Sequence, residues 1–222
     1  MDIDPPLDHP DYRSTRLRHP TEPLVYLPEQ VTETTGPQLG HLRPGAIEND
    51  LTAAGPVGER ITVSGRLLDA GGRPIRDSLV EIWQANAAGR YRHRADTWDA
   101  PLDPGFGGGG RTVTDAEGRY AFVTIKPGPY PWGNHPNAWR PAHIHFSLLG
   151  RSFEQRLVTQ MYFPGDPLFP YDPIFNAVRD PRARERMVSR FSLEASRESW
   201  ALAYEFDIVL GGRDRTPMDE EH

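Results

Sequence analysis

The sequence contains no cysteine, which excludes disulfide bonds, thiolate metal sites, iron–sulfur clusters and cysteine nucleophiles. It has no hydrophobic run near the roughly 18 residues that cross a membrane, and its first residues lack the apolar stretch and positive charge of a secretory signal. Basic residues are in deficit, with 25 against 31 acidic residues and a net charge of −6, whereas a nucleic-acid-binding surface needs a basic excess. We therefore expect a cytoplasmic protein that binds neither a membrane nor a nucleic acid.

Residues that form turns are abundant instead. The 21 glycines and 23 prolines make up about a fifth of the chain, above the usual share but below that of disordered low-complexity segments. Nine Phe, eight Tyr and five Trp supply large side chains for a folded core. Many turns together with many aromatic residues favour a strand-rich fold with long loops.

Several short segments have the alternation, or the β-branched and aromatic composition, that is typical of strands. The turn at Asp115–Gly118 predicts a hairpin between the segments on either side of it. The expected strands are residues 61–67, 79–83, 111–114, 119–125, 142–149, 157–163 and 200–210. Short strands separated by turns predict an all-β fold, a β-sandwich of mostly antiparallel strands.

One short helix is expected late in the chain. Asp180 is a good N-cap and Pro181 suits the first helical position. An apolar stripe at helical spacing follows at Ala183, Met187, Val188 and Phe191.

The first part of the chain differs in composition from the rest. Residues 1–58 are rich in proline and have no sustained period, which predicts an extended, irregular arm, whereas residues 59–222 carry the strands of the β-sandwich domain. Composition alone does not distinguish an arm that lies on its own domain from one that wraps a partner subunit.

His143 and His145 are the histidines whose spacing would allow them to act together at one site. Positions i and i+2 of a strand share one face, so both imidazoles lie together, while Ile144 and Phe146 face the core. Two imidazoles on one face of a core strand favour a metal site over a purely structural role.

The spacing of the histidines does not determine the other ligands of such a site. Glu154 could complete a two-histidine, one-carboxylate iron(II) site. Tyr91 and Tyr130 are the other candidates, because each stands in an unusual setting of glycine or proline.

Five segments, LVEIWQAN, GRYRH, TDAEGRYAF, IKPGPYPW and WRPAHIHF, occur in this order and together resemble the intradiol ring-cleaving dioxygenases. The resemblance extends from about residue 20 to Leu210 and is strongest to the branch that cleaves protocatechuate, whose iron-bearing chain is a β subunit. It implies one non-haem Fe(III) per chain, bound by Tyr91, Tyr130, His143 and His145.

The resemblance also implies roles for residues around the metal. Arg140 would stabilise negative charge on the substrate during the reaction. The implied pocket residues are Trp83, Trp132, Gln160, Tyr162 and Ile174.

The implied reaction is cleavage of protocatechuate by O2 to 3-carboxy-cis,cis-muconate. The implied partner is a homologous α subunit, in a hetero-oligomer of αβ units in which the arm of residues 1–58 makes subunit contacts. Two alternatives remain: an intradiol dioxygenase for another catechol, such as catechol or hydroxyquinol, and a non-catalytic transthyretin-like binding domain.

The two tyrosines are expected to behave differently. Tyr130 stands between Pro129 and Pro131, and we expect it in a loop away from any strand ladder, where its phenol can swing while the backbone stays in place. The resemblance likewise implies that Tyr130 leaves the metal when substrate binds and acts as an internal base, while Tyr91 remains bound.

Overall fold

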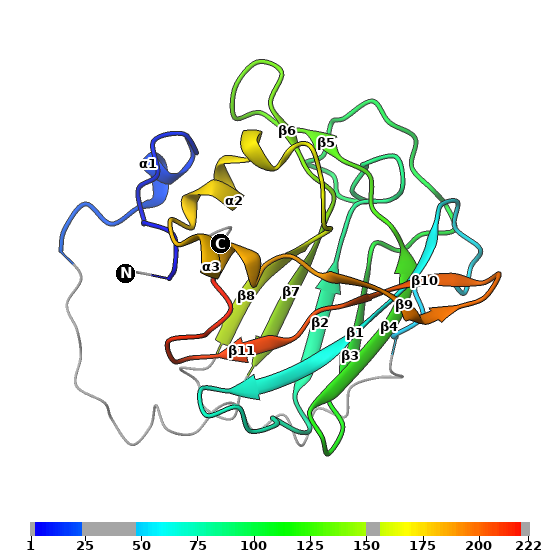
Figure 1. Cartoon of the computed structure of the whole chain (residues 1–222). Helices are drawn as coiled ribbons and strands as arrows, with labels where there is room; N and C mark the ends of the chain where they lie inside the picture. Colours follow the sequence, from blue (N-terminus) through cyan, green and yellow to red (C-terminus); the bar gives the residue numbers. More distant parts are fainter. Residues whose placement is uncertain (1–2, 24–47, 150–155, 219–222) are drawn as a thin grey trace.

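The computed structural model describes residues 3–23, 48–149 and 156–218, in which two β-sheets pack face to face (Figure 1). One sheet has the order β11–β1–β10–β9, with β4 on the opposite edge of β1, and the other has the order β3–β2–β7–β8. The strands are β1 (Arg60–Asp69), β2 (Leu79–Trp83), β3 (Gly109–Val113), β4 (Arg119–Ile125), β5 (Tyr130–Pro131), β6 (Trp139–Arg140), β7 (His143–Leu149), β8 (Arg156–Tyr162), β9 (Arg190–Arg197), β10 (Ala201–Glu205) and β11 (Ile208–Leu210). In the described part of the chain, this arrangement confirms the predicted all-β sandwich.

The core lies between the two sheets and follows from the alternation along the strands. On β7, Ile144, Phe146 and Leu148 are fully buried against the facing sheet. The Phe146 ring meets Phe122 of β4 and Phe206, with ring centroids 5.9 and 5.3 Å apart. Because side chains alternate along a strand, this packing turns His143 and His145 to the other face of β7.

The predicted hairpin at Asp115–Gly118 is wrong. β3 pairs with β2 in one sheet, whereas β4 pairs with β1 in the other, so this turn carries the chain between the two sheets. The turn itself is closed as expected, by a hydrogen bond from the Gly118 amide to the Asp115 carbonyl. Local turn chemistry predicts a reversal of direction, but strand partners are selected by distant packing.

The predicted helix begins where expected but is short. The Asp180 side chain accepts a hydrogen bond from the Arg182 amide at the start of α3 (Pro181–Glu185). Beyond it the backbone of Met187 bonds to Tyr162 instead of continuing the helix, and Phe191 lies in β9. Pairing with β8 therefore overrides the helical spacing of the apolar residues.

Three helices and three strands, β5, β6 and β9, that the sequence patterns did not predict complete the described part of the fold. The further helices are α1 (Thr15–Arg18), the 3-10 turn η4 (Phe169–Tyr171) and α2 (Pro173–Ala177). The segment expected as one strand, 200–210, is divided into β10 and β11, and β9 pairs with β10. No helix among the described residues is long and apolar enough to cross a membrane.

Residues 3–23 of the N-terminal arm pack on the domain beside α2, whereas residues 48–51 lie along β3 and β4 (Figure 1). The Tyr12 ring lies 5.2 Å from the Trp132 ring, and Ile3 is buried with Phe175 and Tyr162. The division of the chain into an arm and a domain at residue 58 remains a prediction.

Candidate metal centre

The pairing of β7 fixes the places of both histidines. His145 lies between Trp83 on β2 and Gln160 on β8, and His143 lies opposite Tyr162 on β8. Both imidazoles are buried, with 2% of His143 and 4% of His145 exposed. The site therefore rests on a rigid sheet and is covered by the loops that follow β2 and β4.

The loop after β2 presents Tyr91, and a carboxylate holds it in place. The Asp96 side chain accepts hydrogen bonds from the Tyr91 amide at 2.7 Å and from the Trp98 amide at 2.8 Å. Upstream, the Asn86 side chain accepts from the Arg90 amide at 2.9 Å. Sequence reasoning missed Asp96 and Asn86, although Asp and Asn in a glycine-containing loop are typical of such backbone-binding turns.

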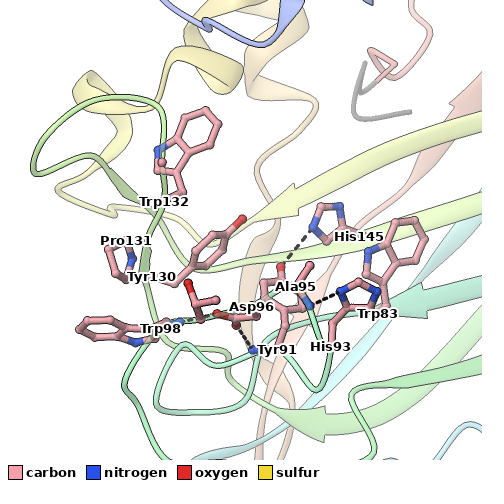
Figure 2. Close-up of a pocket in the computed structure, with 12 residues that line it drawn as sticks. Trp83, Tyr91, His93, Ala95, Asp96, Trp98, Tyr130, Pro131, Trp132 and His145 are labelled. Atoms are coloured by element: carbon pink, nitrogen blue, oxygen red, sulfur yellow. Dashed lines mark hydrogen bonds between the residues drawn. The ribbon is translucent and has the colours of Figure 1, made fainter.

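Tyr130 differs from its expected setting. It is paired with Arg140 in the two-stranded ribbon of β5 and β6, so it does lie in a strand ladder, although one of only two residues on each strand. The expectation of an unpaired loop is therefore wrong at the backbone, because a proline-flanked residue can still pair in so short a ribbon. The side chain projects toward the cavity, as Figure 2 shows.

Glycines bring the two tyrosine-bearing loops together. A Cβ on Gly89 would lie 2.1 Å from the Pro129 carbonyl oxygen, and one on Gly128 would lie 2.4 Å from the Ala87 carbonyl oxygen. Gly89 also has a φ of +77°, which side chains disfavour. With the backbones in contact, the rings of Tyr91 and Tyr130 meet edge to face, 5.2 Å apart.

Three donor atoms converge at the centre of the site, and Figure 2 shows two of the residues that carry them, Tyr91 and His145. The Tyr91 Oη atom lies 3.1 Å from His145 Nε2 and 3.5 Å from His143 Nε2, and the two Nε2 atoms lie 3.2 Å apart. Two atoms that bind one metal ion at about 2.0–2.2 Å are separated by about 3 Å, so these spacings fit the edges of a coordination shell. The residues therefore fit a metal ion, with Tyr130 on the neighbouring loop.

A hydrogen bond of His143 determines which of its ring nitrogens can bind a metal ion. Nδ1 lies 2.7 Å from the Pro141 carbonyl oxygen, which can only accept, so Nδ1 carries the proton and Nε2 presents a lone pair to the centre. Burial, helped by the nearby Arg140 guanidinium and His145, holds the pKa of His143 well below its usual range. A neutral imidazole is the form that binds metal.

A carboxylate ligand finds no support in the described residues, where no group of three His, Cys, Asp or Glu side chains is placed to hold a metal. Glu154, the carboxylate considered from sequence, lies outside the described residues.

A cavity of about 1010 Å³ opens beside the converging donors. Trp83 and Trp132 line it, as expected, and Tyr91, Tyr130 and His145 reach it. Trp83 also stacks on His145, with ring centroids 4.8 Å apart and planes 4° from parallel.

The other expected pocket residues lie away from the cavity lining. Gln160 and Tyr162 share a face of β8 but are fully buried, and Ile174 is buried in α2. None of the three is among the residues that line this cavity in the described part of the chain.

Arg140 is fully buried and connects these groups. Its Nη1 lies 3.2 Å from Tyr130 Oη and 3.2 Å from His143 Nε2. Its Nη2 donates to Gln160 Oε1 at 2.5 Å, to Tyr162 Oη at 3.0 Å and to Asp172 Oδ2 at 3.1 Å. The Asp172 contact is an ion pair with both side chains fully buried.

Sequence reasoning missed Asp172. The one available signal was the sequence Asp172-Pro173, the same helix-start pattern as Asp180-Pro181.

The chain is similar to known proteins along most of its length. A family model described as "Dioxygenase" matches residues 34–212, and a model of the protocatechuate 3,4-dioxygenase beta subunit N terminal region matches residues 4–30. The chain is 61% identical to a protocatechuate 3,4-dioxygenase beta chain from Burkholderia cepacia, over 95% of this chain and 92% of the relative. It is 30% identical to a protocatechuate 3,4-dioxygenase alpha chain from Pseudomonas putida, over 87% and 97%. The crystal structure of 3-chlorocatechol 1,2-dioxygenase from Rhodococcus opacus 1CP is similar, with a TM-score of 0.56 at 26% identity over 76% of this chain and 68% of that chain.

Proposed function

The chain belongs to the intradiol dioxygenase family, and on that basis we propose that it cleaves protocatechuate (3,4-dihydroxybenzoate) with O2 to 3-carboxy-cis,cis-muconate. The N-terminal match at residues 4–30 supports this substrate over catechol or hydroxyquinol. The observation that carries the proposal is the convergence of the Tyr91 phenol with the imidazoles of His143 and His145 beside a cavity large enough for an aromatic ring.

Tyr91, Tyr130, His143 and His145 are the proposed ligands of one non-haem ferric ion per chain. Phenolate oxygen is a hard donor that suits a hard trivalent ion, and two neutral imidazoles complete the set without adding charge. When bound, ferric iron supplies Lewis-acid chemistry that activates a chelated catechol toward O2. The fit rests on the spacings of the donor atoms and on the hydrogen bond that His143 Nδ1 donates to the Pro141 carbonyl oxygen, which leaves Nε2 free to bind metal.

Substrate binding releases protons, and side chains of the site can accept them. A catechol that binds through both oxygens as a dianion gives up two protons, and in this proposal the phenolate of Tyr130 takes one and a hydroxide from solvent takes the other. Tyr130 is held through a ribbon of only two residue pairs, whereas the Tyr91 amide is bound by the Asp96 carboxylate. The phenol oxygen of Tyr91 lies beside both histidine Nε2 atoms, whereas that of Tyr130 lies beside Arg140 Nη1, and this difference favours Tyr130 as the tyrosine that moves and acts as internal base.

Arg140 is the proposed stabiliser of negative charge during cleavage. Its guanidinium is buried, carries a permanent charge, and directs Nη1 toward the Tyr130 phenol and His143. A fixed donor in a site with little water stabilises developing charge more than the same donor in solvent. Trp83 and Trp132, which line the cavity, would bound the aromatic ring of the substrate.

A homologous α chain is the proposed partner, in an assembly built from αβ units. The similarity of this chain to both a beta and an alpha chain over most of its length supports a pair of related subunits. The arm of residues 1–58 would make part of the contact. A chain that is monomeric alone and cleaves protocatechuate at the full rate without a partner would contradict this part of the proposal.

The test is turnover of protocatechuate, catechol and hydroxyquinol by the purified chain, alone and co-expressed with a candidate α chain, together with its metal content. We expect one iron per chain, visible absorption from phenolate bound to ferric iron, and preference for protocatechuate. Preference for another catechol would correct the substrate alone. A colourless protein that binds catechols without cleaving them would overturn the enzymatic proposal in favour of a binding domain.

A further inference from the structure

The two ends of the Arg140 guanidinium have different surroundings. Nη1 faces the proposed ligands Tyr130 and His143, each at 3.2 Å. Nη2 is directed away from the centre, to side chains of β8 and to Asp172, the residue that precedes α2. The guanidinium is rigid and planar, so whatever fixes Nη2 also aims Nη1.

Asp172 is held in the fold through both its side chain and its backbone. Its Oδ1 accepts from the Ile174 amide at 3.0 Å and so caps α2, while Oδ2 accepts from Arg140. Its backbone is held as well, because its carbonyl accepts from the amide and the side chain of Asn176 at 3.0 and 2.8 Å. The carboxylate is therefore a fixed point against which the arginine can be oriented.

The neutral partners of Nη2 cannot replace this carboxylate. Gln160 and Tyr162 both accept from Nη2, and Tyr162 donates in turn to Gln160 Oε1 at 2.8 Å. Neither carries a charge, whereas a fully buried guanidinium needs an opposite charge to offset its lost hydration. Without that charge the guanidinium would lose the partner that offsets its burial and would no longer be held in one orientation.

We propose that Asp172 is a positioning residue of the catalytic site, whose buried carboxylate orients Arg140 so that Nη1 faces Tyr130 and His143. This inference rests on the proposed function, in which Arg140 stabilises negative charge on the substrate. It gives α2, a helix that contributes no side chain to the cavity lining, a defined effect on the reaction.

The first test is Asp172→Asn in the iron-loaded full-length chain with its partner. Asparagine has nearly the same size and still caps a helix, but it removes the charge that pairs with Arg140. We expect kcat per iron to fall about tenfold with KM within about twofold, because the loss concerns transition-state stabilisation more than binding. The visible band of the resting enzyme should move to longer wavelength, because a phenolate that loses a hydrogen bond transfers charge to iron more readily.

Asp180→Asn is the matched control. Asp180 caps α3 through the same Asp-Pro start and has no part in the site, so its variant should keep the wild-type kcat per iron and the wild-type band. If Asp172→Asn also keeps kcat per iron within about twofold and leaves the visible band at the wild-type wavelength, Asp172 serves only the helix and the proposal is overturned.

A second pair of variants decides whether Asp172 acts through Arg140. Arg140→Met and the double variant Arg140→Met/Asp172→Asn should have the same kcat per iron, because without the arginine there is nothing left to orient. A further tenfold loss in the double variant would refute the positioning role. The double variant leaves no unpaired buried charge, whereas Arg140→Met leaves the Asp172 carboxylate without its ion-pair partner, so both variants are compared per folded, iron-loaded chain.

Failure of this inference is distinct from failure of the proposed function. A wild-type protein without iron or catechol cleavage would overturn the function. An active wild type whose rate and band are unchanged in Asp172→Asn overturns only the role of Asp172.

Discussion

Replacing Gly89 by alanine should damage the metal site without touching any proposed ligand. Two effects add at this position: the φ of +77° would cost alanine about 1–2 kcal/mol, and the new Cβ would lie 2.1 Å from the Pro129 carbonyl oxygen. The contact becomes tolerable only if the Pro129 segment retreats by about 1 Å, and a misplacement of that size at a reacting centre lowers the rate about 100-fold. Because Tyr130 is the next residue, the retreat would carry its phenol away from Tyr91.

The assay compares iron per chain, protocatechuate turnover and thermal stability of three variants. Gly72→Ala is the matched control, since Gly72 has a φ of +76° but nothing within 4 Å of the added Cβ. Gly128→Ala is the converse case, because its Cβ would meet the Ala87 carbonyl oxygen at 2.4 Å without a positive φ. We expect Gly72→Ala to keep its iron and to lower Tm by about 2–4 °C for each of the roughly 1–2 kcal/mol that its positive φ costs. Gly89→Ala and Gly128→Ala should lose iron, and their turnover should fall at least about 100-fold. Gly89→Ala with the iron content and turnover of Gly72→Ala would refute the idea that backbone contact between the loops sets the site.

Three further predictions concern single side chains. Tyr130→Phe should retain iron but bind and cleave protocatechuate slowly, because it lacks the internal base. Resonance Raman spectra recorded before and after anaerobic substrate binding should show that this variant loses no tyrosinate. Loss of one tyrosinate in this variant would reverse the roles of the two tyrosines. Asp96→Ala should free the Tyr91 amide, weaken iron retention and broaden the visible band, and an unchanged rate of iron loss to a chelator would count against it. Tyr120→Phe should leave the buried Phe206 carbonyl without the phenol that donates to it, which lowers stability by about 1–3 kcal/mol in urea unfolding while iron content stays unchanged; a loss of iron would show that the far sheet influences the site.

The sequence was most informative where chemistry depends on local spacing. The alternation of His143 and His145 with Ile144 predicted which face of β7 carries the imidazoles, and the core packing of Ile144 agrees. The start of α3 at Asp180 could also be predicted from the sequence, because capping depends on a local hydrogen bond.

The sequence was least informative where distant segments meet. Nothing in Arg119–Ile125 reveals that β4 pairs with β1 and not with its neighbour β3. Asp172 became meaningful only when the fold brought it to Arg140, and neither residue carries a local sign of the other. The same holds for Gly89, whose contact with Pro129 joins two loops that are far apart in the chain.

The pairing of β1 also has a consequence for the order in which the protein is made. The sheet that carries the two histidines has all four of its strands once Tyr162 has been synthesised. β1, by contrast, pairs on one edge with β10 and β11, so Ile61 waits for Leu202 and Leu67 for Ile208. Until those residues leave the ribosome, an edge of β1 stays open to pairing with other chains. The interval before the last strands emerge, after the histidine-bearing sheet already has all its strands, is therefore a period in which the new chain is exposed to aggregation through β1.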